Sequence, residues 1–221
     1  MGITQIDVNK FVEYCRTNLD LSAKHNAIQY GSLGPCILDC IYSLRAQYYK
    51  VTVPVVKRYG KAFMRGNVYA PGYTLRDFIS HIKNSGDTRE FAVNVLKNKQ
   101  VLSGRLKSEI CLELAEKLFE KGIETKEDFA SFDQSKLEQI MRQVTGVGNA
   151  AVNYMFMLSG DPNRCKPDVH IHHCIKDAIE RDVSDPDCQI LFTEAVKVLK
   201  KDCSQITVAL LDGFVWEKYR V

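Results

Sequence analysis

The sequence predicts an all-α protein. Apolar residues recur at the 3.6-residue spacing of amphipathic helices from one end of the 221-residue chain to the other. Only 6 prolines interrupt this pattern, and there is no low-complexity tract or long internal repeat. Hydrophobic residues make up 45% of the chain, which is ample for the core of one globular unit that could be split into two lobes.

Three predicted helices in the middle of the chain carry this pattern clearly. The segment from Ser103 to Glu109 leads into a long helix with Ile110, Leu114 and Leu118 on one face. Two more helices follow, with apolar residues at the same spacing: Leu137, Ile140, Met141 and Val144 in the first, and Ala151, Tyr154, Met155 and Leu158 in the second. A turn of about four residues joins these two helices.

That turn contains Gly146, Val147, Gly148 and Asn149. Gly146 can take the left-handed conformation that ends a helix, and Gly148 lets the backbone approach a partner closely. The N-terminus of the second helix then presents amides to an anion such as a phosphate. Most Gly-x-Gly pairs merely turn the chain, so this alternative stays open.

About twenty residues further on, the loop Lys166-Pro167-Asp168 opens another predicted helix. Asp168 stands at its N-cap, where a carboxylate accepts hydrogen bonds from the first amides. The residue is therefore either a cap alone or a carboxylate that also does chemistry.

The order of these parts resembles that of the helix-hairpin-helix DNA glycosylase superfamily, which includes endonuclease III. The helix after Ser103–Glu109 matches the Lys-Ala-Glu helix of that enzyme, and Ile41–Gln47 resembles its Leu-Ser-x-Gln segment. Asp168 and His170 lie in an Asp-Val-His-x-x-His segment that also resembles 8-oxoguanine glycosylases. The resemblance extends from about Pro35 to Val221.

The resemblance implies two helical lobes, residues 29–160 and residues 1–28 with 161–221, with a cleft between them. It makes Asp168 the catalytic carboxylate and Gln47, helped by Tyr48 or Tyr49, the residue that enters the gap left by a flipped nucleotide. It further implies that DNA is bound by the hairpin residues Gly146, Val147, Gly148 and Asn149, by Lys107 and by His170. Candidates for stacking on the flipped base are Trp216, Tyr154 and Tyr219.

Two departures from the family refine this expectation. Bifunctional members carry their Schiff-base lysine two residues after the last hairpin glycine, where this chain has Ala150. The iron-sulfur loop of endonuclease III is missing, and Cys165, Cys174, Cys188 and Cys203 are spaced too widely to imitate it. We therefore expect a monofunctional glycosylase without a cofactor, except for a backbone-bound sodium or potassium ion near Val144 and Val147.

Charge is distributed unevenly. Cys40 to Arg76 and Phe91 to Ser108 contain no acidic residue, whereas acidic residues concentrate in Glu109 to Asp133 and Glu180 to Asp187. Basic side chains in the acid-free stretches are suited to a DNA backbone, although an ordinary solvated face is the alternative. They are Arg45, Lys50, Lys57, Arg58, Lys61, Arg65 and Arg76 in the first stretch and Lys97, Lys99, Arg105 and Lys107 in the second.

Composition also indicates where the protein resides and which partners it can have. The chain has no apolar run near 18 residues and no signal-peptide pattern at Met1, which predicts an intracellular protein with no membrane partner. Its eight cysteines are expected to be reduced and mostly buried. We expect a monomer that binds double-stranded DNA with a damaged or mismatched base, in the cytoplasm (at the nucleoid) or in the nucleus, depending on the organism.

Two other function classes remain. A DNA-binding module could have kept the fold and lost catalysis. A metal-dependent hydrolase could use the cluster His170, His172 and His173, flanked by Cys165 and Cys174, although His172 points away from the helix face that the other two histidines share.

Overall fold

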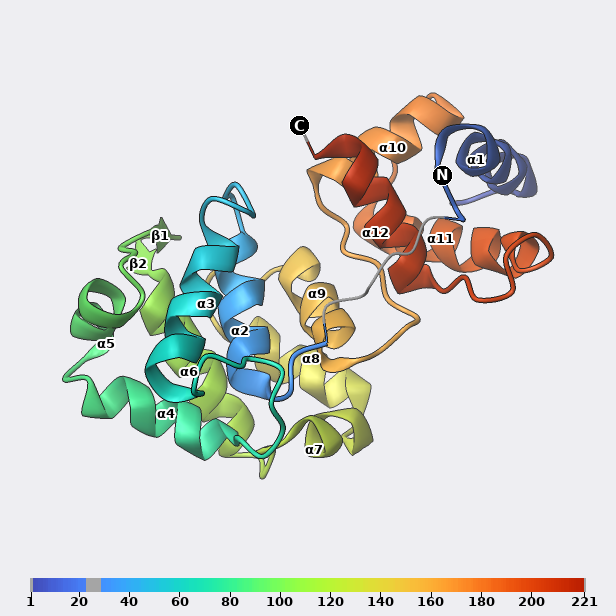
Figure 1. Ribbon diagram of the computed structural model, residues 1–221. Helices are drawn as coiled ribbons and strands as arrows, with labels where there is room; N and C mark the ends of the chain where they lie inside the picture. Colours follow the sequence, from blue (N-terminus) through green and yellow to red (C-terminus); the bar gives the residue numbers. More distant parts are fainter. Residues whose placement is uncertain (1, 23–28, 221) are drawn as a thin grey trace. The chain divides into compact units, whose positions relative to one another are not determined.

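The all-α fold class is confirmed. The computed structural model describes residues 2–22 and 29–220, so residues 23–28 of the predicted lobe lie outside the described residues. The helices in Figure 1 are α1 (Gln5–Asn18), α2 (Leu33–Ser43), α3 (Thr52–Phe63), α4 (Leu75–Asn84), α5 (Thr88–Glu90), α6 (Lys107–Phe119), α7 (Lys126–Ser131), α8 (Gln134–Arg142), α9 (Asn149–Ser159), α10 (Val169–Ile179), α11 (Asp185–Leu199) and α12 (Val208–Tyr219). A π-helical turn spans Phe91–Val95, and β1 (Val101–Leu102) pairs antiparallel with β2 (Arg105–Leu106).

The chain divides into two compact units. The central unit is Gln29–Gly160, and the split unit is Met1–Ile28 with Asp161–Val221. None of the described helices is long and apolar enough to cross a membrane.

Helix α2 forms the centre of the central unit. Every residue from Leu33 to Tyr42 is buried, and α3, α6 and α9 pack around the helix (Figure 1). A helix that is apolar on nearly all sides, with Asp39 as its one charged residue, is typical of such a position. The thiols of Cys36 and Cys40 donate to the carbonyl oxygens of Leu158 and Ala151, at 3.3 and 3.2 Å, and so join α2 to α9.

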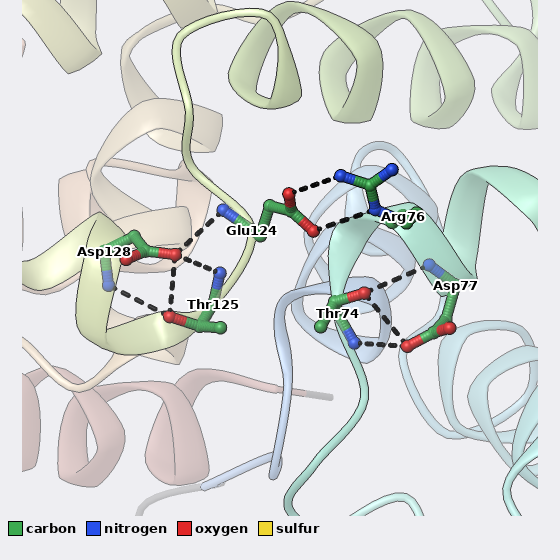
Figure 2. Close-up of polar contacts among 6 residues, drawn as sticks. All are labelled: Thr74, Arg76, Asp77, Glu124, Thr125 and Asp128. Carbon is green, nitrogen blue, oxygen red and sulfur yellow. Dashed lines mark hydrogen bonds and ion pairs between the residues drawn. The ribbon is translucent and has the colours of Figure 1, made fainter.

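Matching N-terminal caps fix α4 and α7 in the same unit (Figure 2). Thr74 and Asp77 form a reciprocal capping box at α4, and Thr125 and Asp128 form the same arrangement at α7. Between the two caps, the Arg76 guanidinium donates to both carboxylate oxygens of Glu124, at 2.9 and 3.3 Å. Arg76 is therefore tied to an acidic partner from outside the acid-free stretch.

The split unit has its own core among α1, α10, α11 and α12. The rings of Phe11 and Phe192 pack with centroids 5.1 Å apart, and Arg181 binds the Asp7 carboxylate at 2.8 Å. All eight cysteines of the chain are free, and all except the half-buried Cys203 are buried. The prediction that the thiols are mostly buried is confirmed.

Candidate functional site

The hairpin between α8 and α9 has the backbone conformation that its glycines predict. Gly146 has a φ of +101°, and a Cβ added there would lie 3.1 Å from Ile110 Cδ1, so this position requires glycine. The Val147 amide donates to the Val144 carbonyl at 3.0 Å and closes the turn. Gly148 differs from Gly146, because its φ is −96° and nothing lies within 4 Å of an added Cβ.

The N-cap residue of α9 provides no side-chain cap. This residue is Gly148, whereas α8 begins with Asp133, whose carboxylate accepts from the Lys136 amide at 2.8 Å. The side chain of Asn149 is held instead by the Arg142 guanidinium of α8. The helix dipole therefore places partial positive charge at the N-terminus of α9, where the N-cap residue Gly148 is exposed.

The segment between α2 and α3 carries Gln47, which is exposed. Its carbonyl oxygen accepts from the amides of Lys50 and Val51 at 3.1 and 2.9 Å, in the turn that leads into α3. The hydroxyl of the neighbouring Tyr48 donates to Asp39 Oδ2 at 2.6 Å, whereas the Tyr49 side chain is 54% exposed. Of the two tyrosines predicted to help Gln47, Tyr49 is the accessible one.

The predicted DNA contact by Lys107 is wrong. The residue is only 2% exposed, and its ammonium donates to the carbonyls of Tyr42 and Leu44 and to Gln100 Oε1, at 3.2, 2.7 and 2.9 Å. These three bonds use every donor of an ammonium group, which leaves none for a phosphate. Burial lowers the pKa of Lys107 to about 8.

Apart from Lys107, the basic side chains of the two acid-free stretches fall into two groups. Arg76 pairs with Glu124, Arg105 pairs with Glu113 at 2.5 Å, and Arg58 donates to the Leu96 carbonyl. The second group is exposed and makes no ion pair with any described acidic residue: Arg45, Lys50, Lys57, Lys61, Arg65, Lys97 and Lys99. This second group can neutralise phosphates without first breaking a salt bridge.

Asp168 is the N-cap of α10, as predicted. Its Oδ1 accepts from the amides of His170 and Ile171 at 3.0 and 3.4 Å, and its side chain keeps 20% exposure. The Lys166 ammonium lies 3.7 Å from Oδ2. Helix α10 thus orients one carboxylate oxygen and leaves the other beside a cation.

A second carboxyl group, Asp212 of α12, contacts the same loop. It is 7% exposed, and its Oδ2 accepts from the Lys166 backbone amide at 2.7 Å. Burial, and then the negative charge of Asp168, raise the pKa of Asp212 to about 8. Sequence reasoning missed this residue, because nothing around Asp212 distinguishes it from an ordinary helical aspartate.

The histidines of α10 are not brought together as metal ligands. His172 Nε2 lies 3.0 Å from Asp185 Oδ1, whereas His173 is exposed. Among the described residues, no group of three or more His, Cys, Asp or Glu side chains could hold a metal ion. The metal-dependent hydrolase therefore lacks the cluster on which that hypothesis depends.

The candidate stacking residues already have partners. The Tyr154 hydroxyl donates to Asp39 Oδ1 at 2.9 Å, and the Tyr219 hydroxyl donates to Asp177 at 2.6 Å. The Arg220 guanidinium lies over the Trp216 ring, 5.2 Å from its centroid. The central unit contains the hairpin, Gln47, Tyr48 and Tyr154. The split unit contains Asp168, His170, Trp216 and Tyr219.

Comparisons with known proteins bear on the fold and the family. A solved structure described as MBOgg1 in complex with a low affinity DNA ligand is similar at a TM-score of 0.62 and 12% identity. The match covers 95% of this chain but only 65% of that one, and at this identity it concerns the fold alone. No curated protein matches the chain. A family model described as "Domain of unknown function (DUF8548)" matches residues 9–220, almost the entire sequence, and the chain therefore belongs to that family.

Proposed function

We propose that this protein is a monofunctional DNA glycosylase of base-excision repair, which flips a damaged or mismatched base out of duplex DNA and hydrolyses its N-glycosidic bond. The observation that carries the proposal is Asp168, a partly exposed carboxylate fixed by two amides at a helix N-terminus. The structural neighbour supports the same reading, because it was determined with a DNA ligand.

DNA binding is proposed to start at the hairpin. The uncapped N-terminus of α9 accepts a phosphate without reading sequence, and the exposed lysines and arginines of the acid-free stretches bind further phosphates. His170, at the start of α10, adds a contact close to Asp168. Gln47 then fills the gap that the flipped nucleotide leaves.

The chemistry is assigned to Asp168. Its carboxylate stabilises positive charge on the sugar as the C–N bond breaks, or takes a proton from the attacking water. The water oxygen bonds to the anomeric carbon and the base leaves with a proton, so the products are free base and an abasic site. Ala150 offers no amine for an imine, and the abasic strand therefore stays intact.

Further features are proposed on the same basis. The enzyme acts as a monomer on duplex DNA, at the nucleoid in the cytoplasm or in the nucleus, and needs no iron-sulfur cluster. A sodium or potassium ion at the hairpin would be held by main-chain oxygens near Val144 and Val147. The Val144 carbonyl accepts one hydrogen bond, from Val147, and so retains a lone pair for such an ion.

A DNA-binding module without catalysis is the second candidate. One observation favours it: the Lys166 ammonium, 3.7 Å from Asp168 Oδ2, offsets the negative charge that the chemistry needs. Both candidates bind DNA, so only release of a base separates them.

The deciding experiment incubates the protein with duplexes that each contain one defined lesion or mismatch and measures free base. We expect release from at least one duplex, and Asp168→Asn, which keeps the cap but not the charge, should lower the rate about 100-fold or more. Asp133→Asn is the matched control, an N-cap aspartate at the far end of α8, and should leave the rate unchanged.

Two results would count against this assignment. Unchanged release by Asp168→Asn would return Asp168 to a purely structural cap, and no release from any duplex would favour the binding module.

Borohydride present during turnover should trap no protein-DNA adduct. An adduct would disprove the monofunctional class and would direct attention to Lys166 as the amine.

A further inference from the structure

Two buried charged residues hold the segment 44–51, which joins α2 to α3 and carries Gln47. The first is Lys107, at the start of α6. Its ammonium binds the carbonyls of Tyr42 and Leu44, at the C-terminal end of α2, where the helix dipole favours a positive charge. Gln100 Oε1 is its third acceptor, so Lys107 fixes the point at which the segment leaves α2.

The second is Asp39, which is fully buried on α2. Its Oδ2 accepts from the hydroxyls of Tyr30 and Tyr48, each at 2.6 Å, and its Oδ1 accepts from the Tyr154 hydroxyl at 2.9 Å. Tyr48 directly follows Gln47, and Tyr154 lies on α9, the second helix of the hairpin motif. Asp39 therefore ties the segment to the helix whose N-terminus is proposed to hold the DNA backbone.

The backbone between these two anchors is also fixed. Arg45 has a φ of +51°, a left-handed conformation that a non-glycine residue keeps only when its surroundings enforce it. The Gln47 carbonyl accepts from the amides of Lys50 and Val51, which directly precede α3, and the Tyr48 carbonyl accepts from those of Thr52 and Val53, the first two residues of α3, all at 2.9 to 3.1 Å. Gln47 is exposed in a segment that is held on one side by Lys107, through Leu44, and on the other by Asp39, through Tyr48.

We propose that Lys107 and Asp39 are positioning residues, which hold segment 44–51 in a preformed shape so that Gln47 enters the duplex without first being ordered. The role in DNA rests on the glycosylase function proposed above. Its physical advantage is that the ordering of the segment takes place on folding and does not oppose the flipping step.

The chain offers a matched pair of variants. Tyr48→Phe and Tyr30→Phe each remove one hydroxyl that donates to the same carboxylate oxygen at the same distance, but only Tyr48 belongs to segment 44–51. Lys107→Met removes the other anchor and keeps an apolar chain of similar length. Hydrogen exchange tests, without DNA, whether Lys107 and Asp39 hold segment 44–51 in place; we call this arrangement the clamp. We expect faster exchange of the amides of Lys50, Val51 and Thr52 in Tyr48→Phe and Lys107→Met, and wild-type exchange there in Tyr30→Phe.

Base release tests the role in DNA. On a duplex with a paired target base, Tyr48→Phe should be about 10- to 100-fold slower than Tyr30→Phe. On a duplex whose target base is already unpaired, the two variants should release base at similar rates. A general loss of folding would slow release from both duplexes, and so cannot imitate this pattern.

The outcomes separate the two proposals. Unchanged exchange in both Tyr48→Phe and Lys107→Met would overturn the clamp, whatever the protein does to DNA. Faster exchange together with equal rates on paired and unpaired targets would overturn the positioning role. Faster exchange with a wild type that releases no base would support the clamp and reject the glycosylase.

Discussion

Asp212 illustrates how much a single side chain depends on its surroundings. A carboxyl group that is buried beside Asp168, with one backbone amide as its hydrogen-bond donor, keeps its proton at a pH where an exposed aspartate would be ionised. Asp168 is held differently, because its carboxylate accepts from two amides at the N-terminus of α10. The surroundings of Asp212 therefore favour its protonated form.

The raised pKa of Asp212 predicts how the stability of the fold depends on pH. The folded protein holds the Asp212 proton up to about pH 8, whereas the unfolded chain releases it near pH 3.8. The free energy of unfolding therefore falls as pH rises through this window, because the unfolded state binds fewer protons there. Asp212→Asn keeps an acceptor for the Lys166 amide and removes the titration, so it should be more stable than wild type at pH 8 by about 1–3 kcal/mol, and the gain should shrink toward pH 4.

Thermal unfolding of both proteins between pH 4 and pH 9 measures this effect. Asp182→Asn serves as the control, since its side chain is 79% exposed, and it should follow the wild-type profile. Parallel curves for wild type and Asp212→Asn would mean that Asp212 is ionised in the folded protein.

At the scale of elements, the sequence predicts best what is encoded locally. The left-handed Gly146 and the N-cap at Asp168 both follow from glycine spacing and a Pro-led loop, and both are present. The burial of Lys107 could not be predicted, because its acceptors Tyr42 and Leu44 lie more than 60 residues away in sequence. Pairing of Arg76 with Glu124 likewise depends on packing between segments that are distant in sequence, α4 and the connection between α6 and α7.

The hairpin yields a prediction about Gly148. Its extended backbone and open surroundings accept a side chain in the free protein, so Gly148→Asp and Gly148→Asn should both fold normally. Both add bulk in front of α9, but only Asp adds a charge that repels phosphate. We expect Gly148→Asp to bind duplex DNA about 10-fold more weakly than Gly148→Asn, by the same factor for every sequence.

Dissociation constants measured on several unrelated duplexes provide the test, with Gly148→Asn as the neutral, nearly isosteric control. If the two variants bind equally, no phosphate lies at this helix end. If the loss is confined to one sequence, the hairpin reads bases.

At the scale of the whole molecule, charge is divided between the two units. Residues 29–160 hold 18 Lys and Arg against 13 Asp and Glu, a net charge of +5, and the rest of the chain holds 12 against 14, a net charge of −2. The net charge of +3 conceals this division. An excess of unpaired lysine and arginine in the unit that carries the hairpin is suited to steering a duplex toward it.

Lys57 and Lys61 test whether that charge contacts DNA. They lie one turn apart on α3, are exposed, and make no ion pair with any described acidic residue. If each neutralises one phosphate, replacing both by Gln should flatten the slope of log affinity against log salt by about 1.8, since each phosphate contact contributes roughly 0.9. The control removes the same charge from the split unit, Lys176→Gln with Lys197→Gln, whose ammonium groups pair with Asp182 and Glu194 at 3.1 and 2.6 Å. That pair should leave the slope unchanged. Equal changes in slope for the two double variants would mean that binding senses total charge, and that α3 makes no defined contact with the DNA backbone.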